Sequence, residues 1–114
     1  MKLIDTRFGM NSLVKIVVSG FYTKDNSPRI DLVDSVTGEP HATCTLCHDE
    51  APREGYVFIK DYSENEGIPS LLAKNGVIER LPCGVLNGIR EWKLTEAMVK
   101  IVDEARYQEK SHAN

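Results

Sequence analysis

Polar turn clusters divide the first part of the chain into four short segments of strand-forming sequence. The clusters, at residues 24–28, 37–40 and 49–55, contain the Gly, Pro, Asp and Asn residues that favour turns and loops. The segments between them are rich in β-branched and aromatic residues, and Gly20 in the first segment indicates a β-bulge. The predicted strands are residues 13–22, 29–36, 41–47 and 56–60. The last of them is apolar on both faces, which suits a central strand.

The pattern changes after residue 60, where apolar residues take helical spacing. Ser63 and Glu66 have the spacing of a capping box, in which two side chains satisfy free backbone N–H groups at the start of a helix. Asn65 is an alternative cap, because Pro69 is tolerated only near the first helical turn. Gly76 can take the left-handed conformation that ends a helix. We therefore expect an internal helix that ends near this glycine.

The last third of the chain predicts two more strands and a second helix. Residues 77–81 and 89–94 are the strands, and Asn87-Gly88 between them favours a tight hairpin because both residues accept positive φ. Trp92 is assigned to the core. Thr95 is the predicted cap of the second helix. The apolar stripe of this helix comprises Ala97, Met98, Ile101, Val102 and Ala105.

Together these elements predict a single α+β domain at residues 1–107, followed by a polar C-terminal tail at residues 108–114. We expect a mainly antiparallel, curved sheet of about five to six strands, with one internal and one C-terminal helix packed against it. The length of 114 residues fits one domain. An apolar fraction of 41% and a charged fraction of 27% are typical of a globular protein.

Charge and hydropathy limit the cellular location and the kinds of partner that we expect for this protein. The formal net charge is −3, so there is no basic field that would favour general nucleic-acid binding. Asp5 and Arg7 interrupt the N-terminal segment, which has no apolar run of signal-peptide length, and no stretch approaches the roughly 20 apolar residues of a membrane helix. We expect a cytoplasmic protein without a membrane partner, whose three cysteines stay reduced.

The sequence Cys-Thr-Leu-Cys-His at residues 44–48 is the sharpest local motif. Its spacing matches c-type haem attachment, but that chemistry requires export to an oxidising compartment. Zinc is the alternative, with Cys44, Cys47, His48 and either Cys83 or His41 as four ligands. Residues three apart in a strand point to opposite faces, which separates Cys44 from Cys47. We therefore predict no cofactor and assign Cys44 to the core.

A second cluster lies at the predicted strand-to-helix turn. It contains the carboxylates Asp61, Glu64 and Glu66. The favoured interpretation is that the turn starts the helix, and a hard-cation or catalytic carboxylate site is the other alternative. No catalytic residue is predicted, although His41 could meet a Ser or Cys in space. If the turn is a contact surface, its predicted residues are Asp61, Tyr62, Glu64, Asn65 and Glu66.

The same segment carries a family resemblance. Residues 58–67 (FIKDYSENEG), followed by Leu71-Leu72, residues 75–78 (NGVI) and Gly84, resemble an uncharacterised family of small proteins encoded by bacteriophages, plasmids and their bacterial hosts. The resemblance covers roughly residues 39–94. It implies a strand leading into KDYSENEG, then a short helix, a Gly stop and a strand pair, and it brings no activity. The paired cysteines and the final helix depart from the family pattern.

The resemblance implies an accessory protein that acts on host machinery. The first hypothesis is a non-enzymatic binding protein of a phage or mobile element, such as an anti-CRISPR-like inhibitor of a bacterial defence system, acting in the host cytoplasm. Its partner would be a host protein or protein complex, and a homodimer is left open. A small metal-dependent or nucleotide-handling enzyme is the second hypothesis. The third is a sponge for a nucleotide signal, with Arg29, Arg80 and Arg90 as phosphate-binding candidates.

Overall fold

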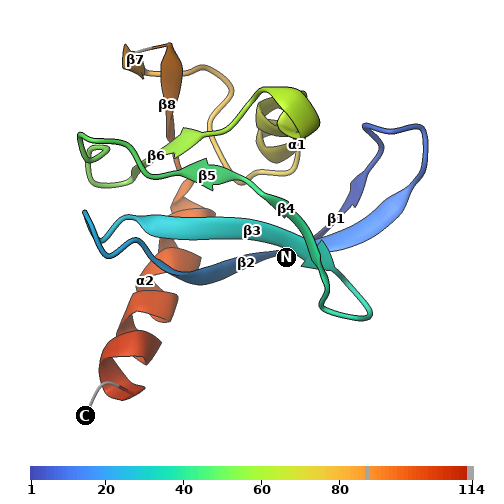
Figure 1. Cartoon of the computed structure of the whole chain (residues 1–114). Helices are drawn as coiled ribbons and strands as arrows, with labels where there is room; N and C mark the ends of the chain where they lie inside the picture. The colour runs from blue at the N-terminus through green and yellow to red at the C-terminus, as the bar shows by residue number, and fades with distance from the viewer. Residues whose placement is uncertain (87, 113–114) are drawn as a thin grey trace.

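The computed structural model describes residues 1–86 and 88–112, which form one α+β domain (Figure 1). All strand pairings in this part of the chain are antiparallel, so the predicted fold class is confirmed. The strands are β1 (Lys2–Asp5), β2 (Ser12–Phe21), β3 (Pro28–Asp34), β4 (Pro40–Thr43), β5 (Thr45–Leu46), β6 (Tyr56–Ile59), β7 (Gly84–Leu86) and β8 (Ile89–Lys93). The helices are the 3₁₀ turn η1 (Ser63–Asn65), α1 (Ile68–Lys74) and α2 (Glu96–His112).

The first sheet has the strand order β1-β2-β3-β4. Alternate residues of β2 and β3, such as Ile16 and Leu32, are buried on the inner face and lie opposite each other in the register. The register shifts between Val18 and Gly20, which confirms the predicted bulge. The short strand β1 was not predicted, because only four residues pair with β2.

The chain passes from the first sheet to the second at Cys44. The predicted strand at residues 41–47 is divided there into β4 and β5. The N–H of Cys44 donates to the Ile30 carbonyl in the first sheet at 2.9 Å, and the Cys44 carbonyl accepts from the Lys60 N–H beyond β6 at 2.9 Å. The buried Thr45 hydroxyl accepts a hydrogen bond from the Ile30 N–H at 3.0 Å. These bonds join the two sheets at a single point.

The second sheet has the order β5-β6-β8-β7. β6 is an internal strand whose Val57, Phe58 and Ile59 are all buried, as predicted for a central strand. β7 and β8 pair as a hairpin, but its first strand is Gly84–Leu86 and not the predicted residues 77–81, and Asn87 of the predicted turn lies outside the described residues. The predicted strand at residues 77–81 is wrong. Only Ile78 pairs, in an isolated bridge with Leu94, because the chain then bends away and leaves residues 79–81 exposed.

The predicted capping box is also wrong. Ser63 begins η1 with a φ of 58°, and no side-chain hydrogen bond caps either η1 or α1. Gly67, with a φ of 87°, occupies the N-cap position of α1, and Pro69 lies in the first turn. The alternative cap Asn65 is buried instead. A left-handed glycine therefore sets the entry of the chain into α1, and the polar side chains before it are free for other contacts.

Helix α2 covers the inner face of the first sheet beside β2 (Figure 1). Thr95 is its cap, as predicted, since the Thr95 hydroxyl accepts from the Met98 N–H at 3.2 Å. Within the predicted stripe Met98 and Val102 are buried, whereas Ala97 is exposed and Val99 packs on the core instead. The helix continues to His112, so the predicted tail is helical over residues 108–112. Neither α-helix of the described chain is long and apolar enough to cross a membrane.

Both sheets and both α-helices contribute to one hydrophobic cluster. Trp92, predicted as a core residue, is part of it. A single cluster shared by every layer indicates that the two sheets fold as one unit. Its members include Leu3, Ile16, Ile30, Leu32, Val57, Ile59, Ile68, Leu72, Ile78, Trp92 and Met98.

We predict that Leu32→Ala lowers the free energy of unfolding by about 2–5 kcal/mol, because it leaves a cavity at a site with 0% exposure. Leu81→Ala is the matched control, since Leu81 is 76% exposed and its truncation is expected to change stability by less than about 0.5 kcal/mol. Urea denaturation of both variants measures the difference. Equal effects would contradict the assignment of the core.

Candidate functional site

The predicted acidic turn projects three side chains outward. It follows β6 and contains η1. Tyr62, Glu64 and Glu66 are exposed, Asp61 is half-buried and Asn65 is 1% exposed. The structure therefore places four of the five predicted contact residues at or near the surface and turns Asn65 inward.

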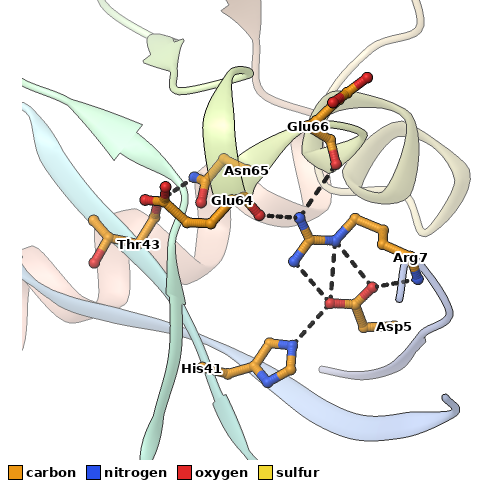
Figure 2. A network of polar contacts seen from close by, with 7 residues as sticks. All are labelled: Asp5, Arg7, His41, Thr43, Glu64, Asn65 and Glu66. Atoms are coloured by element: carbon orange, nitrogen blue, oxygen red, sulfur yellow. Dashed lines mark hydrogen bonds and ion pairs between the residues drawn. The ribbon is translucent and has the colours of Figure 1, made fainter. Parts of the chain in front are cut away.

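Asn65 fixes the turn to the first sheet. Its Nδ2 donates to the carbonyl oxygen of Thr43 at 2.6 Å (Figure 2). Thr43 ends β4, just before the chain changes sheets. A buried amide with such a partner holds its backbone in one place, because losing the bond would leave a desolvated polar group. In the same turn Ser63 has a φ of 58°, which is uncommon for residues other than glycine.

Arg7 holds the same turn from the other side. Its Nη1 donates to the carbonyl oxygens of Glu64 at 2.9 Å and Glu66 at 3.3 Å (Figure 2). The Arg7 side chain is only 9% exposed, so its charge is largely removed from water. Arg7 follows β1, and its guanidinium therefore ties the N-terminal hairpin to a turn that is 57 residues further along the chain.

Asp5 balances the charge of Arg7. Its carboxylate, with a side-chain exposure of 1%, accepts hydrogen bonds from Arg7 Nε at 3.0 Å and Nη2 at 2.9 Å, and from the Arg7 backbone N–H at 3.0 Å. Burial on its own raises the pKa of Asp5. The hydrogen bonds from Arg7 and His41 outweigh it and lower the pKa from 3.8 to about 2. The carboxylate is therefore ionised at all physiological pH values.

His41 completes the network. Its Nε2 lies 2.8 Å from Asp5 Oδ2 (Figure 2). Within residues 1–86 and 88–112, no hydroxyl or thiol is hydrogen-bonded to this imidazole. The sequence left open a pairing of His41 with a Ser or Cys, and the structure places Asp5 against the ring instead, where the contact orients the imidazole as part of the anchor of the turn.

The exposed carboxylate of Glu64 forms an ion pair with Lys60, with 2.5 Å between Oε1 and Nζ. The hydrogen bond from Lys60 is the main cause that lowers the pKa of Glu64 from 4.5 to about 2. A general base at neutral pH works best with a pKa near 7. Glu64 is therefore ionised at neutral pH and paired with Lys60, which suits a role in binding better than proton transfer.

The candidate metal ligands are not brought together. Cys44 is fully buried, and burial raises the pKa of its thiol to about 12. Cys47 and Cys83 are exposed, and all three thiols are free. His48 packs edge-on against Phe58 with ring centroids 6.0 Å apart. The described residues contain no group of three or more His, Cys, Asp or Glu side chains placed to hold a metal ion.

The Asp5–Arg7–His41 network is the part of the site that sequence reasoning missed. In the sequence, Asp5 and Arg7 show only as charges that interrupt the N-terminal segment. The sequence contains a weak signal that Asp5 is buried. Leu3 and Asp5 alternate with the exposed Lys2 and Ile4 and so share the buried face of β1. Nothing in the spacing links this strand to His41 or to residues 64–66.

No protein-family model, no curated protein sequence and no solved structure matches this chain.

We predict that Arg7→Ala lowers the free energy of unfolding by about 3–5 kcal/mol, because it leaves the Asp5 carboxylate buried without its main partner. The amide N–H groups of residues 64–67 should also exchange faster with solvent. Hydrogen exchange measured by mass spectrometry, together with urea denaturation, tests both effects.

Arg53→Ala is the matched control for this variant. Arg53 pairs with Glu91 at 2.7 Å, but its side chain is 59% exposed, so its loss is expected to cost less than about 1 kcal/mol. If both arginine variants lost the same stability, Arg7 would not be the anchor of the turn.

We predict that stability falls as pH drops from about 4 to about 2. The folded pKa of Asp5 lies below the ordinary value, so its contribution is complete above pH 4–5 and is lost as the carboxylate is protonated. Asp5→Asn removes the part of this dependence that is due to Asp5, which amounts to roughly 2 kcal/mol. Urea denaturation at several pH values measures the slope.

Proposed function

We propose that this protein is a small, non-enzymatic binding protein of a phage or mobile genetic element that acts on a host protein or complex in the host cytoplasm. Inhibition of a bacterial defence system of the CRISPR kind is the activity that we favour. One observation carries the proposal. The acidic turn is fixed by Arg7 and Asn65 from within, while Tyr62, Glu64 and Glu66 face solvent.

A fixed turn is a favourable binding element. Ordering a loop on association costs free energy, and a loop that is already ordered avoids this cost. Tyrosine is enriched among the residues that dominate protein–protein binding energy, and Tyr62 is 54% exposed. Arg7 and Asn65, which hold the turn from within, therefore also affect the surface, because they keep the exposed side chains of the turn in a single arrangement.

An exposed aromatic ring lies beside the turn. Phe8 is 65% exposed, and the Arg7 guanidinium lies 4.7 Å from the centroid of its ring. The same guanidinium contacts the carbonyls of Glu64 and Glu66. We call Phe8, Tyr62, Glu64 and Glu66 the acidic contact surface. Its chemistry, two aromatic rings with two carboxylates of which Glu64 is paired with Lys60, fits a basic protein surface such as the one that a nuclease uses to hold nucleic acid.

The proposal predicts that a partner retained by the full chain is lost when the acidic contact surface is altered. Tyr62→Ala and the double variant Glu64→Lys/Glu66→Lys should each weaken binding at least tenfold, or about 1.4 kcal/mol. The experiment is affinity capture from lysates of bacteria that carry a defence system, followed by a titration with the purified partner.

Tyr107→Ala and Glu109→Lys are matched controls on the exposed face of α2, where Tyr107 is 72% exposed. These variants should bind the partner like the unaltered chain. Retention of no host protein, or equal binding by the turn and α2 variants, would refute the proposal.

A further inference from the structure

Strand β1 is an edge of the first sheet, and one row of its backbone groups bonds to no other residue of the described chain. The N–H of Ile16 donates to the Met1 carbonyl at 2.9 Å, and Met1 continues the register in which Leu3 lies opposite Val14. In an antiparallel pair the bonded residues alternate, so Leu3 and Asp5 bond to β2 while Lys2 and Ile4 point their N–H and C=O groups away. The Ser35 N–H, which donates to Leu13 opposite Ile4, fits this alternation.

A groove runs along this free edge. Its other wall is α1, and the two elements lie at the same end of the molecule (Figure 1). The groove has a volume of about 660 Å³. Lys2, Ile4 and Asn11 line it on the hairpin side, and Ser70 and Lys74 line it on the helix side. An edge strand that faces a helix across a groove is the arrangement in which an extended peptide can add as a further strand.

The charged residues that line the groove indicate which kind of segment it can bind. Its lining residues include Lys2, Arg7 and Lys74 and no acidic residue, although the whole chain has a net charge of −3. Arg7 is neutralised by Asp5. Lys2 and Lys74 are exposed and form no ion pair with any residue of the described chain. Two uncompensated ammonium groups, one on each wall, attract a negatively charged segment.

We propose that the groove between β1 and α1 binds an extended, acidic segment of a partner protein, which adds to the first sheet as a strand beside β1. The backbone of the segment would bond to the free groups of Lys2 and Ile4, and its carboxylates would face Lys2 and Lys74. This inference rests on the proposed function in that it supplies a second contact for the same kind of partner. A second copy of the chain is disfavoured, because it would bring the same lysines to the interface.

The test uses the full chain and a displayed library of random linear peptides of 12 residues. Selected peptides should be rich in Asp and Glu. Ile4→Pro removes an edge-facing N–H without removing a bond to β2, and proline is tolerated on edge strands, so this variant should fold and bind the selected peptides at least tenfold more weakly. Lys2→Glu/Lys74→Glu should show a loss of the same size. Peptide binding should also slow hydrogen exchange at the N–H groups of Lys2 and Ile4.

Two controls accompany these variants. Ile4→Thr keeps the N–H, and Lys100→Glu reverses an exposed charge on α2, so both should bind within about threefold of the unaltered chain. Enrichment of basic peptides, no enrichment, or equal binding by Ile4→Pro would overturn the proposal. The proposal would also be overturned if sedimentation showed that the unaltered chain forms a dimer and that Ile4→Pro dissociates this dimer. The occupant of the groove would then be a second copy of the chain.

The outcomes also separate the two proposals. If Tyr62→Ala loses a captured host protein but the library gives no acidic peptide, the groove proposal fails and the proposed function stands. If acidic peptides require Lys2 and Lys74 while no variant of the acidic contact surface affects partner capture, the groove stands and the proposed function fails.

Discussion

The buried ion pair between Arg7 and Asp5 is the constraint on which the candidate site depends. A charge that is 9% exposed is costly unless it is paired and hydrogen-bonded. Arg7 meets this condition with the Asp5 carboxylate on one side and two backbone carbonyls of the acidic turn on the other. Because both sets of partners are needed to satisfy one guanidinium, the position of β1 and the conformation of residues 64–66 are fixed together.

Alternation along β1 gives this short strand two roles. Leu3 and Asp5 face inward, where one joins the hydrophobic cluster and the other holds Arg7. Lys2 and Ile4 face outward and carry the free backbone groups of the sheet edge. The buried residues therefore position the edge, and the charge of Lys2 discourages uncontrolled pairing with apolar strands, which is a common protection of exposed edges.

The sequence predicted those elements that local pattern controls. The strand at residues 13–22 with its bulge, the central strand at 56–60 and the Thr95 cap all follow from periodicity or cap chemistry and are confirmed. The capping box failed because Ser63 begins η1 with a positive φ and Gly67 occupies the N-cap position of α1. The alternative cap, Asn65, donates to the Thr43 carbonyl instead. The Asp5–Arg7–His41 network could not be predicted, since its partners are separated by up to 59 residues and no spacing rule connects them.

The acidic contact surface and the basic groove are neighbours rather than separate features. Gly67, which ends the acidic turn, also lines the groove, and Arg7 touches both regions. Carboxylates on one side of this junction and lysines on the other give the surface opposite charges over a short span. A partner that carries an acidic extended segment next to a basic body would satisfy both at once. Two linked contacts raise the affinity well above that of either alone, because the second forms at a high effective concentration. The buried Arg7 would then act on binding through geometry, by holding the two surfaces at a fixed separation.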